Sequence, residues 1–323
     1  MRRLLALWVL ACLCAASALA APAPQVRFPR DHFGHPGSSI EWWYFTGVVG
    51  DHAGKRYSVF FTLFARQGLV VPVAQVVDLQ TGKLVGHAEG FGAGAPTAAA
   101  VDVSAGGTRL HYLPRTDTWQ VAVKTAGLRF ALSQHPLKPY VLHGGGSGVI
   151  RQSFGGTSHY YSGTRLRASG TIRIGGKDVP VAGQSWFDHQ WGDYANDPRA
   201  FNWNWFSCRF ADGTELMLYE FRNRKTGRVL ARFRNGTFVD ARGRGTQVTD
   251  FAATPTGEPF RAAGHSWPLD WTVSTSAPKM TEHVIALFPD QLVRNTIVPT
   301  FWEGAARATG TKPGTCFVEI SYR

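Results

Sequence analysis

The chain has 323 residues, 13% aromatic residues and a formal net charge of +12 at pH 7. That length suits two domains better than one. The basic residues are scattered rather than gathered in one segment, so we expect no nucleic-acid partner, and the positive charge fits an anionic membrane surface or acidic ligands instead.

The first twenty residues have the pattern of a secretory signal peptide. Arg2 and Arg3 precede an apolar run over 4–13, and the small residues Ala18 and Ala20 mark a cleavage site. The run is too short for a membrane anchor, which needs about 20 apolar residues. We therefore predict that residues 1–20 are a cleaved signal, that the mature chain has no transmembrane segment, and that it is secreted, most simply to a bacterial periplasm.

Short alternating or aromatic-rich segments separated by glycine and Asx turns make up most of the mature chain, and helical periodicity is almost absent. This pattern predicts an all-β barrel or sandwich. The predicted strands are 42–49, 57–65, 71–78, 119–123, 128–133, 165–174, 202–210, 215–222, 228–233, 269–273 and 316–321.

The chain also repeats itself. Residues 41–46, Glu-Trp-Trp-Tyr-Phe-Thr, recur at 202–207 as Asn-Trp-Asn-Trp-Phe-Ser, and an Asp-Gly type of turn and a strand follow each copy. Near the end of each half, 161–170 resembles 302–310 with one gap. Matches in the same order at both ends indicate an internal duplication.

We therefore predict two related barrels, one over 21–188 and one over 189–323. A barrel of about eight strands can hold one small ligand. The alternative is an interior filled by the barrel's own side chains.

Residues 183–194 read Gly-Gln-Ser-Trp-Phe-Asp-His-Gln-Trp-Gly-Asp-Tyr. Asp188 stands next to His189 among aromatic residues. A carboxyl beside aromatic rings is partly desolvated, which raises its pKa, and aromatic faces attract cations. The stretch suits chemistry in which a proton is given to an apolar substrate and positive charge develops.

Three strings resemble the AttH-like / hydroxyneurosporene synthase family, which includes carotenoid 1,2-hydratases. They are Glu-Trp-Trp-Tyr-Phe-Thr-Gly at 41–47, Ser-Trp-Phe-Asp-His-Gln-Trp-Gly at 185–192 and Phe-Trp-Glu-Gly at 301–304. The resemblance implies tandem lipocalin-like barrels, an apolar ligand and, in one branch, cofactor-free hydration of a carotenoid double bond. Other branches include enzymes of pericyclic reactions. Many secreted members lie beside ATP-binding (ABC) transporters, which implies an ABC transporter of the cell envelope as a partner.

The resemblance also places site residues. The hydratase branch's His-x-Trp falls on His189-Gln190-Trp191, and its Tyr-x-Asp aligns with 219–221, where Phe221 replaces the acid. Glu220 is one residue off register and so faces the other side of the strand. On this interpretation Asp188 or His189 is the acid, Trp191 stabilises the cation, and Tyr219 positions the water or the acid.

The duplication adjusts these roles. Glu319 is the counterpart of Asp188, whereas His189 and Trp191 have no counterpart. We therefore favour His189 and Trp191, with Asp188 holding or charging the imidazole. The alternative is a structural corner in which Asp188 and His189 satisfy backbone groups.

Aromatic residues of both repeats, together with one acid, are the predicted ligand-binding residues. His32, His35 and Glu41 have the residue types of a metal site. Glycine and proline make this segment a loop, however, so we favour a hydrogen-bonded plug at the barrel entrance, in which Glu41 bonds to the backbone or to a histidine. No metal site and no cofactor are predicted. The predicted ligand-binding residues are Glu41, Trp42, Trp43, Tyr44, Trp186, Trp203 and Trp205.

Cys208 and Cys316 remain after the signal is removed. They could pair in an oxidising compartment or be two small buried apolar residues, and the sequence leaves both open. A serine hydrolase is disfavoured, because Ser185 and Asp188 would face opposite sides of one strand.

The sequence thus predicts an exported lipocalin-like protein that binds an apolar, isoprenoid- or lipid-like molecule. If it is an enzyme, we expect a hydratase (a carbon–oxygen lyase) that hydrates or isomerises a C=C bond by acid catalysis. The chief alternative is a non-catalytic periplasmic carrier that works with an envelope ABC transporter, and the third is a protein-interaction scaffold.

Overall fold

The computed structural model describes residues 26–151, 156–194, 201–230 and 234–321, so the predicted signal peptide lies outside the described residues. Strands make up most of this part of the chain, and its one helical element is the 3-10 turn Arg30–His32. None of the helical structure described is long and apolar enough to cross a membrane. The predicted all-β fold class is confirmed.

The first sheet contains the N-terminal half and has the strand order β4-β3-β2-β1-β13-β12-β9-β8-β7-β6. The short strand β5 pairs with β3, and β10 and β11 both pair with β12. The bounds are β1 Ile40–Gly50, β2 Arg56–Arg66, β3 Leu69–Asp78, β4 Leu84–Glu89, β5 Gly92–Ala93, β6 Asp102–Ala105, β7 Thr108–Leu113, β8 Thr118–Lys124, β9 Arg129–Pro136, β10 Val141–Leu142, β11 Val149–Arg151, β12 Gly156–Ile174 and β13 Lys177–Tyr194.

The second sheet contains the C-terminal half and has the order β17-β16-β15-β14-β25-β24-β22-β21-β18, with β23 on β24 and a separate β19–β20 ribbon. The bounds are β14 Phe201–Phe210, β15 Glu215–Asn223, β16 Asn235–Val239, β17 Gly245–Val248, β18 Phe251–Thr256, β19 Phe260–Ala262, β20 His265–Trp267, β21 Asp270–Ser276, β22 Lys279–Ala286, β23 Leu292–Val293, β24 Phe301–Gly310 and β25 Gly314–Ser321.

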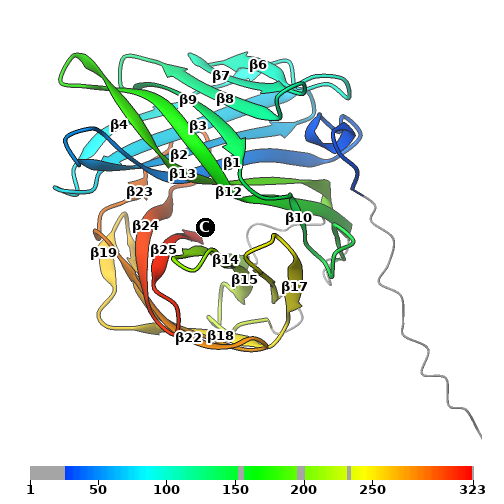
Figure 1. The fold of residues 1–323 in the computed structure, drawn as a ribbon, viewed down its shortest axis with the longest axis vertical. Helices are drawn as coiled ribbons and strands as arrows, with labels where there is room; N and C mark the ends of the chain where they lie inside the picture. The colour runs from blue at the N-terminus through cyan, green and yellow to red at the C-terminus, as the bar shows by residue number, and fades with distance from the viewer. Residues whose placement is uncertain (1–25, 152–155, 195–200, 231–233, 322–323) are drawn as a thin grey trace, which may run out of the picture.

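The two strand orders match position by position from β4 through β7 and from β17 through β18, as the internal repeat predicts, and β6 extends the first order without a counterpart in the described second sheet. Strands β1, β2, β12 and β13 correspond to β14, β15, β24 and β25. The first hairpin of each half turns at a glycine with positive φ, Gly54 (79°) and Gly213 (82°), a conformation that glycine adopts without steric cost. Both sheets curl into nearly closed barrels, one above the other in Figure 1.

Two details differ from the predicted elements. Strand β13 runs to Tyr194 and so crosses the predicted domain boundary at 188/189. At 228–230, the described part of the predicted strand 228–233, a bridge from Val229 to Arg222 forms in place of a strand; residues 231–233 lie outside the described residues.

Cys208 and Cys316 form a disulfide. They lie directly opposite each other on β14 and β25 and point into the core of the second barrel. The pairing that the sequence left open is thereby resolved, and the bridge ties the first strand of the second barrel to its last.

Alternation along the strands produces three apolar clusters. In β1, Trp43 and Phe45 point into the first barrel, whereas Tyr44 points outward toward the other sheet. In β14, Phe206 belongs to the core of the second barrel, and Trp205 faces the first. The third cluster therefore lies between the barrels, where β1 and β13 pack against β14 and β25 (Figure 1).

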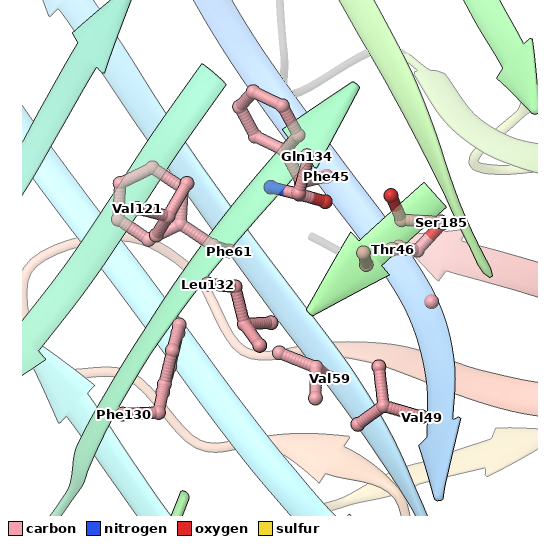
Figure 2. Close-up of a pocket in the computed structure, with 12 residues that line it drawn as sticks. Phe45, Thr46, Val49, Val59, Phe61, Val121, Phe130, Leu132, Gln134 and Ser185 are labelled. Atoms are coloured by element: carbon pink, nitrogen blue, oxygen red, sulfur yellow. The ribbon is translucent and has the colours of Figure 1, made fainter. Parts of the chain in front are cut away.

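Side chains fill the interior of the first barrel. Figure 2 shows Phe45, Phe61, Val121 and Phe130 converging there, and the void left among them is about 10 Å³. That volume is about the size of a single water probe. The sequence left open whether a barrel holds a ligand or is filled by its own side chains, and the first barrel is filled.

Polar contacts at the edges join the barrels. The fully buried Glu215 accepts hydrogen bonds from Lys138 Nζ at 2.8 Å and from Arg165 Nε at 2.7 Å, both on the first half. At another edge, Glu89 accepts backbone N–H groups of Ile297 and Val298 at 2.8 and 3.0 Å. These contacts fix the two barrels against each other and so shape the space between them.

Candidate functional site

A cavity of about 510 Å³ lies between the two barrels. Strands β1, β2 and β13 supply one wall, and β14, β15 and β25 supply the other, each through alternate residues. Leu69 and Phe91 also line it and are 44% and 55% exposed, so this part of the wall reaches the protein surface. Most of the wall is apolar, and its aromatic side chains include Trp42, Tyr44, Trp203, Trp205, Tyr219 and Phe221.

Asp188 is a carboxyl in this apolar wall and is 3% exposed. Tyr160 Oη donates to its Oδ2 at 2.7 Å and Trp186 Nε1 to its Oδ1 at 2.7 Å, and the Ser162 hydroxyl also donates to Oδ1. Burial raises the pKa of Asp188 to about 7, against these hydrogen bonds, which lower it. The effect of burial on the pKa is larger than that of the hydrogen bonds, so Asp188 can carry a proton at neutral pH, as a general acid must.

Two more carboxyls lie near Asp188. Glu319 lines the cavity and accepts Trp203 Nε1 at 2.6 Å. Glu303, directly opposite it on β24, accepts the Tyr44 hydroxyl at 2.8 Å. Burial, and then the charges of Glu319 and Asp188, raise the pKa of Glu303 well above its usual range, although the Tyr44 hydrogen bond lowers it.

The duplication explains where these carboxyls stand. Asp188 pairs with Tyr44 on one side and Ser162 on the other. Glu319 pairs with Trp205 and Glu303 in the same register. The counterparts predicted from the sequence, Asp188 and Glu319, therefore face one shared cavity.

His189 and Trp191 point to the other side of β13, into the first barrel. His189 Nε2 lies 2.7 Å from Glu41 Oε1, and His35 Nδ1 lies 2.7 Å from the same oxygen. Trp191 stacks on the His35 ring, with centroids 3.8 Å apart. The group that holds the His189 imidazole is therefore Glu41 and not Asp188, because adjacent strand residues face opposite ways.

His35, Glu41 and His189 make the contacts expected of the predicted hydrogen-bonded plug, in which Glu41 bonds to a histidine. The donor atoms of His35, Glu41 and His189 lie within 4.8 Å of one another, close enough to be considered as metal ligands. Both imidazoles already contact Glu41 Oε1, and they hold its pKa below the usual range against burial. His32, which the sequence pattern included, instead contacts the Tyr161 hydroxyl at 2.7 Å.

The remaining predicted residues divide between the two places. Trp42, Tyr44, Trp203, Trp205 and Tyr219 line the cavity. Trp43 lies inside the first barrel, stacked on His189, and Trp186 lies behind the cavity wall, where it holds Asp188. Glu220 points into the second barrel, where Arg222 binds it, as its off-register position predicts.

Sequence reasoning missed Tyr160, Ser162 and Glu303. A signal existed for two of them, because the repeat aligns Ser162 with Glu303 and both precede a glycine. Tyr160 is the residue before that repeat begins. Its role depends on Trp205 Nε1, which donates to its hydroxyl at 3.1 Å from the other barrel, and no local pattern contains that contact.

The raised pKa of Asp188 predicts a pH-dependent stability. Because its folded pKa of about 7 exceeds the ordinary 3.8, its contribution is fully present below about pH 4 and is lost as the pH rises to 7. Its share of the slope is at most about 1.4 kcal/mol per pH unit. In urea unfolding at several pH values, wild type is expected to lose stability relative to Asp188→Asn across this window. Parallel curves would contradict the shift.

Comparison with known proteins agrees with this architecture. The family model for AttH-like proteins matches residues 19–322. A solved structure of a Nitrosomonas europaea protein assigned to AttH is 24% identical, with a TM-score of 0.82, over 93% of this chain and 98% of that one. No curated protein matches the chain.

Two further structures share the fold at lower identity. Kievitone hydratase from Nectria haematococca is 18% identical, with a TM-score of 0.78, over 94% of both chains. CghA in complex with Sch210972 is 11% identical, with a TM-score of 0.56, over 88% of both chains. Likenesses of this kind show the fold, while the family match extends over nearly the whole sequence: the chain belongs to the AttH-like family.

Proposed function

We propose that the protein binds an apolar, isoprenoid- or lipid-like molecule between its barrels and hydrates one of its C=C bonds. The observation that carries this proposal is the buried Asp188 carboxyl, whose pKa is raised to about 7, in the wall of an aromatic cavity of about 510 Å³. A volume of that size is typical of small-molecule sites. One structural neighbour is named a hydratase.

In the first step Asp188 gives its proton to one alkene carbon. The π bond breaks, a C–H bond forms, and the other carbon becomes a cation. Aromatic faces such as those of Trp42 and Trp203 stabilise that cation without forming a bond to it. The hydroxyls of Tyr160 and Ser162 then hold the new Asp188 carboxylate.

In the second step water attacks the cation. A C–O bond forms, and the water gives a proton to the Glu319 carboxylate across the cavity. Return of this proton to Asp188 through water restores the starting state, so the net reaction is alkene plus water to alcohol. Tyr219, on the wall beside Trp205, would orient the water.

A second candidate, carriage of an apolar molecule without reaction, is favoured by the exposed Leu69 and Phe91 at the cavity wall. Such a protein could exchange its ligand with a membrane or with an envelope ABC transporter. The Cys208–Cys316 disulfide supports export, because disulfides persist in oxidising compartments.

Ligand retention tests the shared premise. The protein, purified from its host and extracted with organic solvent, is expected to yield about one apolar molecule per chain by mass spectrometry. Val71→Trp, which fills the cavity from β3, is expected to lose it. An isoprenoid alkene or its alcohol favours the hydratase, whereas a phospholipid or fatty acid favours the carrier. Equal retention by Val71→Trp would contradict the site.

A further inference from the structure

The cavity between the barrels passes from a buried inner end to an open mouth. Asp188, Tyr44 and Thr62 lie side by side on β13, β1 and β2 and form the Asp188 row. All three line the cavity and are buried. Trp42 and Phe64, two residues away on β1 and β2, line it too and are half-buried. The cavity therefore opens toward the end of β2.

Arg66 is the last residue of β2 and lies at the mouth of the cavity. It pairs with Leu69 on β3, and both residues line the cavity and are exposed. Strand alternation places Arg66 on the same face as Thr62 and Phe64. Of the described residues that line the cavity, Arg66 is the one with a basic side chain.

The mouth offers hydrogen-bond donors that the protein does not use. The side chain of Arg66 forms no hydrogen bond or ion pair with any described residue. Gln67, the next residue, also lines the cavity. Its φ of 51° and the φ of 77° at Gly68 are both positive, as a two-residue type I′ hairpin turn requires. The turn thus holds a guanidinium and a side-chain amide, both of them donors, at the mouth.

A guanidinium at this place favours an acidic ligand in one orientation. Guanidinium groups bind carboxylates and phosphates through two parallel hydrogen bonds. At the inner end, the ionisable carboxyls that line the wall are Asp188 and Glu319, and no basic side chain lines it there. An anionic head group buried at that end would lack a cation, which is costly. The head group therefore belongs at the mouth and the apolar chain at the inner end.

The distance from the mouth to the acid decides which bond of the chain reaches Asp188. Arg66 follows Thr62 of the Asp188 row by four residues of β2, so the two positions are about 14 Å apart along the strand. Each residue contains three backbone bonds, so an extended chain of roughly ten to twelve single bonds covers that distance. A C=C bond at this separation from the head group lies beside Asp188.

We propose that the ligand is an acidic amphiphile whose carboxylate or phosphate head group binds Arg66 and Gln67 and whose unsaturated chain runs inward to Asp188. This proposal rests on the proposed function, because it uses the same cavity and the same acid. Arg66 then selects the class of ligand, and the length of β2 selects the bond. Addition of one water to the C=C bond of an unsaturated acid gives a hydroxy acid whose hydroxyl is remote from the carboxylate.

Three probes with one chain length test the head-group preference: decanoate, decyl phosphate and 1-decanol, each below the concentration at which it aggregates. Binding is measured by calorimetry at about pH 8, where carboxylates are ionised. At least one of the two acids is expected to bind about tenfold or more tightly than 1-decanol, and the tighter acid identifies the head group. Arg66→Gln is expected to lose this advantage and to keep its affinity for 1-decanol.

The matched control is Arg56→Gln, because Arg56 is exposed at the opposite end of β2 and is not among the residues that line the cavity. All three affinities should stay unchanged in this variant. Equal binding of the acids and 1-decanol by wild type would overturn the preference and leave the apolar cavity standing. An advantage that survives in Arg66→Gln would overturn its placement at the mouth. Failure of all three probes to bind would overturn the proposed function as well.

The position of the hydrated bond tests the orientation. cis-Vaccenate has its double bond roughly ten bonds from the carboxyl carbon and petroselinate at about half that distance, so hydration of cis-vaccenate is expected to be at least about tenfold faster. Arg66→Gln should narrow this difference, and Arg56→Gln should keep it. Equal rates in wild type would overturn the orientation. Hydration of neither acid, with decanoate still bound through Arg66, would overturn the hydratase and leave a carrier of acidic lipids.

Discussion

Replacement of Asp188 by asparagine is expected to slow alkene hydration by about 10²- to 10⁴-fold, the usual contribution of a general acid. Asparagine keeps the size of the side chain and can still contact Tyr160, Ser162 and Trp186, but it has no proton to give. Ligand affinity should therefore change little. The loss should appear in kcat rather than in KM.

The measurement is incorporation of oxygen from isotopically labelled water into a panel of isoprenoid alkenes, followed by mass spectrometry. Asp178→Asn, at the exposed end of the same strand, is the control and should react like wild type. Full activity in Asp188→Asn would remove Asp188 from the mechanism. If His189→Asn abolished activity while Asp188→Asn did not, the acid would lie in the plug inside the first barrel.

Replacement of Glu215 by glutamine is expected to lower the free energy of unfolding by about 3–5 kcal/mol, the usual cost of breaking a buried ion pair from one side. Glu215 is fully buried and binds both Lys138 and Arg165. Burial lowers the pKa of the nearby Arg209 to about 10, and Glu215 opposes that shift. Glutamine would leave these cations without their counter-charge.

The loss is measured by urea unfolding at pH 7. Glu258→Gln is again the control, since an exposed carboxylate contributes little. A loss below about 1 kcal/mol would mean that solvent already compensates the cations. Because Glu215 joins the barrels that enclose the cavity, the variant should also retain less ligand, and the loss of ligand should follow the loss of stability.

Much of the fold could be predicted from the sequence, because the signals are local. Alternation and turn residues gave the strands, and the repeat of 41–46 at 202–207 gave two barrels with matching strand order. The equivalence of Asp188 and Glu319 followed from the same repeat and agrees with the observed register. The off-register position of Glu220 was also predictable, because strand geometry alone decides it.

The candidate site was harder to predict from the sequence than the fold, because residues of both barrels form it. Neighbouring residues Asp188 and His189 look like one unit in the sequence, yet one faces the cavity and the other faces Glu41. Which face is which depends on how the two barrels pack. The contacts from Tyr44 to Glu303 and from Trp205 to Tyr160 join residues far apart in the chain, so no sequence window contains them.

On the proposed function, the ligand lies between the barrels and not inside the first one. A crystal structure with citronellyl bromide, an isoprenoid alkene whose bromine gives an anomalous signal, tests this most directly. Bromine density is expected in the cavity lined by Trp42, Trp203 and Asp188. Density among Phe45, Phe61 and Phe130 inside the first barrel, or no bound bromide at saturating concentration, would contradict it.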